Sequence, residues 1–247
     1  MGLNKEAGLN KAVIIGKATA IVTAAGKGTR MNSDINKQYI DIAGIPVLAR
    51  TIAAFESCKA IADIIVVVNE ENIQYCRRNI IEQYNFSKVK ALISGGTERQ
   101  NSVYKGLCAV DESREIVLIH DGARPFVSDK NIIDCILAAK EFGACGLGVR
   151  LKDTIKICDQ NGFVKTTPDR SSLWSIQTPQ AFSYDIIIEA HKMAIQSGYI
   201  GTDDLVLVER QGKQVKIVEG GYQNIKITTP EDLIMGEAIA KSIEERL

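Results

Sequence analysis

The chain of 247 residues carries 30 basic and 30 acidic side chains, which gives a formal net charge of zero at neutral pH. That balance favours neither a nucleic acid nor a membrane surface as a partner, and the longest apolar stretches, such as Ile64 to Val68, are far shorter than the ~18 residues that a membrane helix needs. The length fits one large α/β domain, which we prefer, or two small ones, and any anion site must be local.

The first 17 residues, MGLNKEAGLNKAVIIGK, have lysines on both sides of a very short apolar run and no convincing cleavage site, so we expect a cytoplasmic protein rather than a secreted one. The cysteines occur at irregular intervals without a C-x-x-C pair, which indicates reduced core thiols rather than disulfides or a zinc site. They are Cys58, Cys76, Cys108, Cys135, Cys145 and Cys158.

Short β-branched runs alternate with segments of helical periodicity along the chain. The strand-like runs are Thr19–Thr23, Ile64–Val68, Val89–Ile93, Ile116–His120, Gly146–Arg150, Val215–Glu219 and Ile225–Thr228. The helical segments include Pro46–Ser57, Glu98–Val110, Asp129–Phe142, Tyr184–Gln196 and a final helix from Pro230 to about Glu245. This alternation predicts an α/β fold with a mostly parallel sheet.

One stretch, Lys152–Trp174, breaks the alternation. It mixes polar residues, a turn at Gly162 and Pro168 with short strand-like pieces such as Thr154–Cys158. We interpret it as a β-arm that leaves the sheet. Because it lacks the continuous apolar pattern of a buried strand, we expect it to gain order by packing against its two-fold mate in a homodimer.

The first predicted strand runs into a glycine-rich segment, AAGKGTRM (24–31), followed by NSDINKQY (32–39). Small residues let backbone N–H groups approach phosphate oxygens, so a strand end that leads into such a turn can bind an anion. Lys27, Arg30 and Lys37 add positive charge. The spacing matches neither G-x-G-x-x-G nor G-x-x-x-x-G-K-[ST], which argues against a dinucleotide site and a P-loop. By itself, the segment fits an ordinary turn with exposed cations equally well.

Asp121 follows the apolar run Ile116–His120, so it should emerge at the carboxyl end of a central strand, where open α/β sheets bind ligands. A Mg²⁺ ion prefers a carboxylate together with phosphate oxygens and keeps several waters, which makes this position suitable for a metal ligand. His120 should point to the opposite face of the strand, and we interpret it as structural.

These segments, together with further blocks, resemble the 2-C-methyl-D-erythritol 4-phosphate cytidylyltransferases of the non-mevalonate isoprenoid pathway. The further blocks are GGTERQNSV (95–103), HDGARPFV (120–127), KDTIK (152–156), DRSSLWSIQTPQAF (169–182), TDD (202–204) and NIKIT (224–228). They appear in the family's order from about residue 18 to the end, so the resemblance implies that residues 1–17 are an N-terminal extension and residues 18–247 the cytidylyltransferase domain. The sequence departs from the commonest family spelling at Gly122, where alanine is usual, and at Thr97, where the family often has aspartate.

The resemblance implies a Rossmann-like three-layer nucleotidyltransferase fold, with CTP and a sugar-alcohol phosphate as substrates and Mg²⁺ as cofactor, held by Asp121. The catalytic residues that it implies are Arg30, Lys37, Arg170 and Lys226, with Arg170 on the arm reaching into a neighbouring subunit. It implies CTP binding by Ala24, Ala25, Gly26, Gly28, Gly96, Thr97 and Ser102. It implies binding of the second substrate by Arg124, Thr154 and Thr178.

Two alternatives remain at this point. Ribitol 5-phosphate cytidylyltransferases share the glycine-rich loop, the TPQ segment and a block like NIKIT, although HDGARP, DRSSLW and TDD favour the methylerythritol interpretation. A non-catalytic nucleotide-binding subunit could have the same fold, since fold alone does not determine function. The joint presence of Arg30, Lys37, Asp121 and Lys226 argues against that second alternative.

Overall fold

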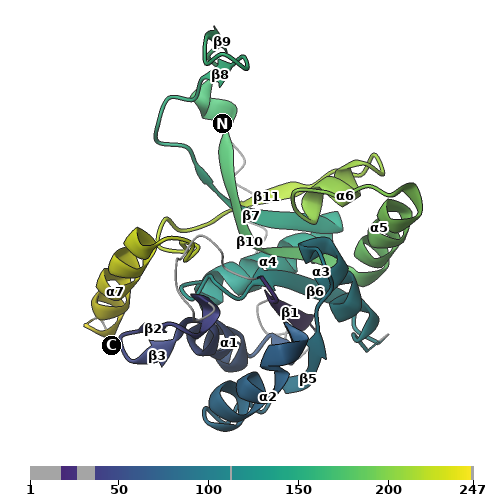
Figure 1. Cartoon of the computed structure of the whole chain (residues 1–247). Coiled ribbons are helices and arrows are strands. Elements are labelled where there is room, and N and C mark those ends of the chain that lie inside the picture. Colours follow the sequence, from purple (N-terminus) through teal and green to yellow (C-terminus); the bar gives the residue numbers. More distant parts are fainter. Residues whose placement is uncertain (1–17, 27–36, 112, 246–247) are drawn as a thin grey trace, which may run out of the picture.

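A seven-stranded sheet forms the centre of the structure, a computed structural model that describes residues 18–26, 37–111 and 113–245 (Figure 1). The strand order is β11-β7-β10-β6-β1-β4-β5. Every neighbouring pair is parallel except those of β10, which runs antiparallel to both β6 and β7. The strands are β1 (Ala18–Ala24), β4 (Ile61–Val68), β5 (Val89–Ser94), β6 (Ile116–Asp121), β7 (Ala144–Arg150), β10 (Trp174–Ser183) and β11 (Lys216–Glu219). The predicted α/β fold with a mostly parallel sheet is confirmed.

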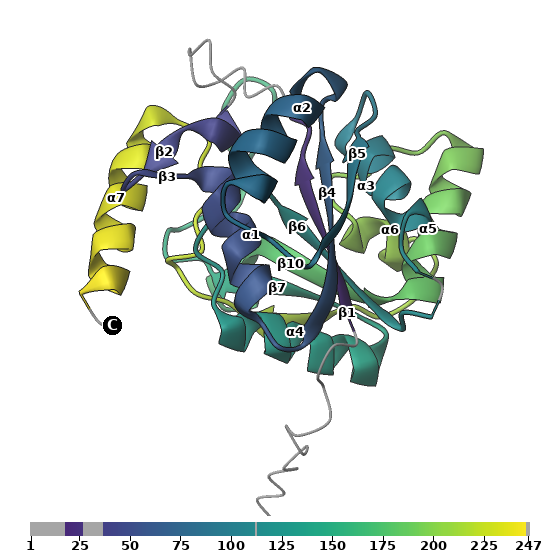
Figure 2. The same ribbon diagram turned by 90° about the horizontal axis from the view of Figure 1, so that it is seen from below.

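Helices cover both faces of the sheet and give it three layers (Figure 2). In β4, Ile64 and Val66 pack with the helices of one face, and Ile65 and Val67 pack with those of the other. This alternation follows from the two-residue period of a strand. The first face is covered by α1 (Val47–Ser57), α4 (Asp129–Phe142), α2 (Ile73–Cys76) and the π-helical turns η5 (Arg77–Glu82). The second face is covered by α3 (Arg99–Cys108), α5 (Tyr184–Ser197) and α6 (Leu205–Glu209).

Strand β10 is an element that the sequence pattern did not predict. It contains Pro179, which has no N–H to donate and is normally excluded from the middle of a sheet. The pairing of β10 with β7 is interrupted between Ile176 and Gln180, and the proline lies in that interruption. The strand therefore passes through the centre of the sheet while its Gln177–Pro179 segment is free to line a pocket.

The predicted strand Ile225–Thr228 is wrong, because these residues form no strand in the structure. The segment is joined to the turn after β6 by a backbone hydrogen bond from the N–H of Ile227 to the carbonyl of Ala123 (2.8 Å). The side chain of Ile227 is fully buried in a small separate cluster with Ile42, Val47, Phe126 and Ala240. That cluster joins this segment and helix α7 (Pro230–Glu244) to the hairpin of β2 (Asp41–Ile42) and β3 (Ile45–Pro46).

The predicted β-arm stands away from the body as the hairpin of β8 (Ile157–Cys158) and β9 (Val164–Thr166), entered from β7 and left toward β10 (Figure 1). The short helical turn η6 (Arg170–Ser172) follows it, and η3 (Lys37–Tyr39) and η4 (Glu70–Asn72) are similar turns in the body. The large apolar side chains Phe163 and Val164 at the arm are 72% and 58% exposed. Within the described ranges, the helices lack the length and apolar character that a bilayer crossing needs.

Only four of the six cysteines are core thiols, which corrects the prediction for the other two. Cys108 and Cys158 are exposed. Cys108 is the last residue of α3 and Cys158 lies in the arm, and no other part of the described structure packs over either thiol. Burial raises the pKa of Cys58 to about 11 and that of Cys76 to about 12. These two thiols are therefore almost entirely protonated near neutral pH, and a protonated thiol is a poor nucleophile.

We expect the native protein to react rapidly with a thiol reagent such as DTNB at Cys108 and Cys158 alone, because the other four thiols are buried. The measurement is the absorbance of the released thiolate, with the modified positions assigned by peptide mass spectrometry. The denatured chain is the control and should release thiolate from all six positions. Rapid modification of Cys58 or Cys76 in the folded protein would contradict the packing described here.

Candidate active site

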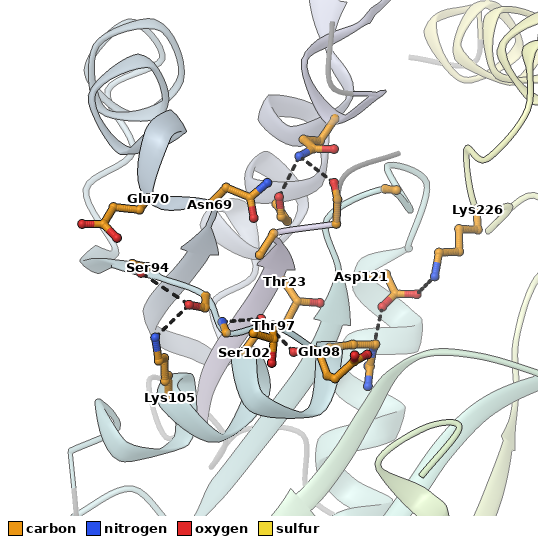
Figure 3. A pocket seen from close by; sticks show the side chains of 18 of the residues that line it. Thr23, Asn69, Glu70, Ser94, Thr97, Glu98, Ser102, Lys105, Asp121 and Lys226 are labelled. Carbon is orange, nitrogen blue, oxygen red and sulfur yellow. Dashed lines mark hydrogen bonds and ion pairs between the residues drawn. The ribbon is translucent and has the colours of Figure 1, made fainter. Parts of the chain in front are cut away.

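Two adjoining pockets open where β1, β5 and β6 end. The larger has a volume of about 870 Å³ and the smaller about 370 Å³. Three residues line both pockets: Arg99, Asp121 and Lys226. They come from the start of α3, the end of β6 and the segment before α7, so three remote parts of the chain meet at the boundary. Figure 3 shows Asp121 and Lys226 in contact there. A ligand in one pocket would contact a ligand in the other at this boundary.

The wall of the larger pocket is made by backbone at the ends of β1 and β5. The buried side chain of Gln38 donates from Nε2 to the carbonyl of Ala24 (2.7 Å) and to that of Gly26 (3.4 Å), which holds the start of the glycine-rich loop. On the other side, Ser102 Oγ accepts from the N–H of Gly96 (3.0 Å). Helix α3 begins here, and its positive N-terminal end faces a pocket that suits an anion.

Asp121 is surrounded by positive charge at the boundary. Its Oδ1 accepts from Arg99 Nε (3.3 Å), and its Oδ2 lies 2.7 Å from Lys226 Nζ and 3.8 Å from Arg124 Nε. Burial acts to raise the pKa of Asp121, but the charges of Arg99 and Lys226 outweigh it, so the pKa is held well below its usual range. The carboxylate is therefore ionised at any physiological pH, and the described cations around it exceed its single negative charge.

Arg99 also pairs with a second aspartate. Its Nη1 lies 2.7 Å from Oδ2 of Asp204, whose side chain is only 1% exposed. The other oxygen of Asp204 contacts Nε2 of the buried His191 at 3.2 Å, and its backbone N–H donates to Gln180 Oε1 (3.1 Å). The TDD segment is thus joined to the end of β6 through one guanidinium group.

At the smaller pocket, a chain of hydrogen bonds connects β10 to the end of β6. The N–H of Asp121 donates to Thr178 Oγ1 (3.0 Å), which lies 3.1 Å from His120 Nδ1, and His120 Nε2 lies 3.0 Å from the carbonyl of Arg124. A carbonyl can only accept, so Nε2 carries the proton and Nδ1 accepts from the threonine hydroxyl. Burial lowers the pKa of His120 to about 4, which keeps the ring neutral. His120 points to the face opposite Asp121 and packs against Phe55, as a structural residue would.

The donor atoms at the boundary are compatible with a divalent metal ion. The part of the chain that the structure describes has no cluster of three or more His, Cys, Asp or Glu side chains that could hold a metal. The oxygens of Asp203 accept from Gln180 and from the N–H of Val206, and those of Asp121 contact Arg99 and Lys226. Asp121 is the carboxylate that lines both pockets, and Mg²⁺ sites built on a single carboxylate draw their remaining ligands from substrate phosphates and water.

Comparison with known proteins decides the family. Residues 18–242 match the family model for 2-C-methyl-D-erythritol 4-phosphate cytidylyltransferase. A protein of that name from Caldanaerobacter subterraneus is 51% identical over 219 residues, which cover 89% of this chain and 96% of the relative. The chain belongs to the 2-C-methyl-D-erythritol 4-phosphate cytidylyltransferase family. It is therefore a nucleotidyltransferase, and the fold class and family expected from the sequence are confirmed.

Other members of the family agree with this assignment. A 2-C-methyl-D-erythritol 4-phosphate cytidylyltransferase from Geobacillus kaustophilus is 52% identical over 225 residues, covering 90% of this chain and 96% of the relative. The crystal structure of 4-diphosphocytidyl-2C-methyl-D-erythritol synthase from Anaerococcus prevotii superposes with a TM-score of 0.81 at 36% identity and covers 92% of this chain and 96% of that one. The cytidylyltransferase from Thermus thermophilus gives a TM-score of 0.74 at 29% identity, with coverage of 92% and 98%.

The structure brings together most of the residues that the resemblance to cytidylyltransferases implied. Ala24, Ala25, Gly26, Gly96, Thr97, Ser102, Asp121 and Lys226 line the larger pocket, and Arg124 and Thr178 line the smaller one. Thr154 and Arg170 lie on the arm and line neither pocket. Gly28 and Arg30 lie outside the described residues, as does the side chain of Lys37, so their implied roles stay predictions.

The sequence pattern did not predict a role at this site for several residues that the structure places there. Arg99 and Asp204 stand within the GGTERQNSV and TDD blocks, but 105 positions separate them, and no local pattern indicates that they pair. Gln38 and Gln180 hold the loop and the TDD segment through buried amide groups. In the sequence, a glutamine among apolar residues is a weak indication of a buried structural role, because glutamine side chains are usually exposed.

We expect Gly95→Ala to raise the KM for CTP by about tenfold, because overpacking costs about 1–3 kcal/mol and each 1.4 kcal/mol is tenfold in affinity. A Cβ at Gly95 would lie 2.6 Å from Cβ of Ala25 and 2.8 Å from Oγ of Ser102, so it would displace both walls of the larger pocket. Gly221→Ala is the matched control, since the nearest atom to its Cβ is 4.0 Å away. Steady-state kinetics measure the effect, and an unchanged KM in a folded Gly95→Ala protein would contradict this account.

Proposed function

We propose that this protein transfers CMP from CTP to 2-C-methyl-D-erythritol 4-phosphate, giving 4-diphosphocytidyl-2-C-methyl-D-erythritol and pyrophosphate, a step of non-mevalonate isoprenoid precursor biosynthesis. The observation that carries the proposal is the pair of pockets that share Asp121, Lys226 and Arg99. CTP occupies the larger pocket, with its phosphates at the boundary, and the acceptor occupies the smaller one. The family membership of the chain supports the same pair of substrates.

The reaction is an in-line displacement at the α-phosphorus of CTP. An oxygen of the acceptor phosphate forms the new bond to this phosphorus, and the bond to the β-phosphate bridging oxygen breaks, so pyrophosphate leaves with the electron pair. The acceptor phosphate is already ionised and needs no general base. The protein therefore contributes positioning and stabilisation of negative charge. We assign this task to Lys226, which lines both pockets, and to Arg30, Lys37 and the arm residue Arg170, and we assign Arg124, in the smaller pocket, to binding of the acceptor.

Recognition of CTP depends mainly on backbone groups. The turn at Gly96 and Thr97, with Ser102 one helical turn later, presents a compact polar surface at one end of the larger pocket, and we assign it to the cytosine base. The backbone of Ala24, Ala25 and Gly26, with Gly28 beyond them, is assigned to the triphosphate.

We assign Mg²⁺ as the cofactor, held by Asp121 together with phosphate oxygens of CTP. Such an ion would neutralise part of the triphosphate charge when bound. The cations next to Asp121 keep its carboxylate ionised and fix its direction, so the carboxylate is prepared for a ligand that arrives with the nucleotide.

The decisive test compares 2-C-methyl-D-erythritol 4-phosphate with ribitol 5-phosphate as acceptor in CTP-dependent pyrophosphate release. We expect the kcat/KM to be at least tenfold higher for the methylerythritol substrate, a difference of about 1.4 kcal/mol in transition-state binding. EDTA should abolish turnover, and added Mg²⁺ should restore it. A preference for ribitol 5-phosphate would overturn the assignment of the acceptor, and turnover in EDTA that equals the untreated rate would overturn the metal assignment.

We also propose that the enzyme is a cytoplasmic homodimer in which each arm completes the site of its partner. Arg170 and Thr154 lie on the arm away from both pockets, and Arg170 donates to the carbonyl of Lys152 in its own chain (2.6 Å). The exposed apolar side chains of Ile157, Phe163 and Val164 provide a surface that a second copy of the arm would bury. In a two-fold assembly, contacts are reciprocal, so both arms would deliver the same residues.

Subunit complementation tests this assembly. Arg170→Ala and Lys37→Ala should each be inactive, because each lacks one cation of a composite site. When subunits are exchanged, about half of the dimers are mixed and each has one intact site, so roughly a quarter of wild-type activity should return. Exchange must be confirmed separately, for example by mass spectrometry of differently tagged chains. Absence of recovery after confirmed exchange would show that Arg170 does not act in the partner's site.

A further inference from the structure

Arg99 lies between the two pockets, and the roles proposed so far in substrate binding and catalysis do not include it. Its guanidinium lines both pockets, and its side chain is 32% exposed toward them. A guanidinium has five N–H groups. The described residues take up two of these, one through Nε to Asp121 and one through Nη1 to Asp204. The remaining N–H groups belong to a side chain that borders the space where the two ligands would meet.

The far side of this guanidinium is anchored by a buried carboxylate. Asp204 is 1% exposed, its carboxylate contacts Arg99 and His191, and its backbone N–H donates to Oε1 of Gln180. A buried carboxylate without a positive partner would be strongly unfavourable, so Arg99 stays on Asp204 while its other groups face the pockets. The anchor lies on the α5 and α6 side of the sheet and touches neither pocket. The charge of Arg99 is therefore preorganised.

Lys226 and Arg99 contact different oxygens of Asp121. Lys226 lies at Oδ2 (2.7 Å), a contact drawn in Figure 3, and Arg99 lies at Oδ1 (3.3 Å). Any phosphate at the boundary would then have a cation at each oxygen of the carboxylate. In an in-line displacement, negative charge on the transferring phosphorus group has to be stabilised in the transition state, and fixed cations in a partly buried site do this well.

We propose that Arg99 is a further catalytic residue, binding phosphate oxygens where the α-phosphate of CTP meets the acceptor phosphate, and that Asp204 is the positioning residue that anchors it. This inference rests on the proposed function. The planar fork of the guanidinium is essential, since it can hold Asp121 and Asp204 and still present N–H groups to a phosphate. The single ammonium of a lysine cannot span the same partners.

The test is steady-state kinetics of Arg99→Gln, Arg99→Lys and Asp204→Asn in the full-length enzyme. We expect Arg99→Gln to lower kcat by on the order of 10²- to 10³-fold with a much smaller change in the KM for CTP. Arg99→Lys should restore only part of this loss. Asp204→Asn should lower kcat as well, and combining it with Arg99→Gln should cost less than the sum of the two effects, because both changes remove the same positioned charge.

Arg114→Gln is the matched control, because Arg114 also forms a partly buried ion pair, with Asp63, but lines neither pocket. Its kcat should equal that of the wild type. Added guanidinium ion should restore part of the kcat of Arg99→Ala if Arg99 supplies a catalytic charge. If the role of Arg99 is purely structural, the substitution should lower the thermal midpoint and guanidinium should not restore kcat. Circular dichroism establishes the fold of each variant.

A folded Arg99→Gln or Arg99→Lys enzyme with wild-type kcat would overturn the inference. If loss of activity is accompanied by loss of the fold in every Arg99 variant, the role is structural and the inference is likewise overturned. Neither result would affect the proposed function, which is tested separately by pyrophosphate release from CTP by the wild-type enzyme with the two acceptors.

Discussion

The site depends on one carboxylate, Asp121, which is held at the end of β6 by cations from separate parts of the chain. Arg99 comes from the start of α3, Arg124 from the turn after β6 and Lys226 from the segment before α7. Each cation would be repelled by the others without the carboxylate between them, and the buried carboxylate would be costly without the cations. The mutual dependence fixes three side chains around a point where phosphates can meet.

The rest of the fold serves to hold these groups in place. Ile227 is buried in the cluster that it forms with α7 and the β2–β3 hairpin, and this burial holds the backbone beside Lys226 although the segment forms no strand. The interruption of β10 at Pro179 lets Thr178 reach the N–H of Asp121 and the ring of His120. The neutral His120 in turn holds the carbonyl of Arg124. Parts of the site are therefore built where regular strand structure is interrupted or absent.

The zero net charge of the chain is consistent with this arrangement. A protein that binds two phosphorylated substrates needs positive charge only where their phosphates lie, and the cations that contact Asp121 are gathered where the two pockets adjoin. A chain of excess positive charge would attract unrelated polyanions, whereas a local cluster inside a pocket selects ligands that fit the pocket. The distribution of charge in three dimensions is what matters, and composition alone does not show it.

The amino-acid sequence by itself determined the class of fold and the position of Asp121 at a strand end, and it predicted a turn of small residues after the first strand. These follow from local patterns: the two-residue period of strands, the helical period and small residues after a strand. Only the tertiary structure decided that β10 crosses the sheet despite Pro179, that Ile225–Thr228 is not a strand, and that Cys108 and Cys158 are exposed. It also decided that Arg99 joins Asp121 to Asp204, 105 positions away. The physical reason is that propensity and periodicity act over a few residues, whereas ion pairs and burial depend on which distant segments the sheet brings together.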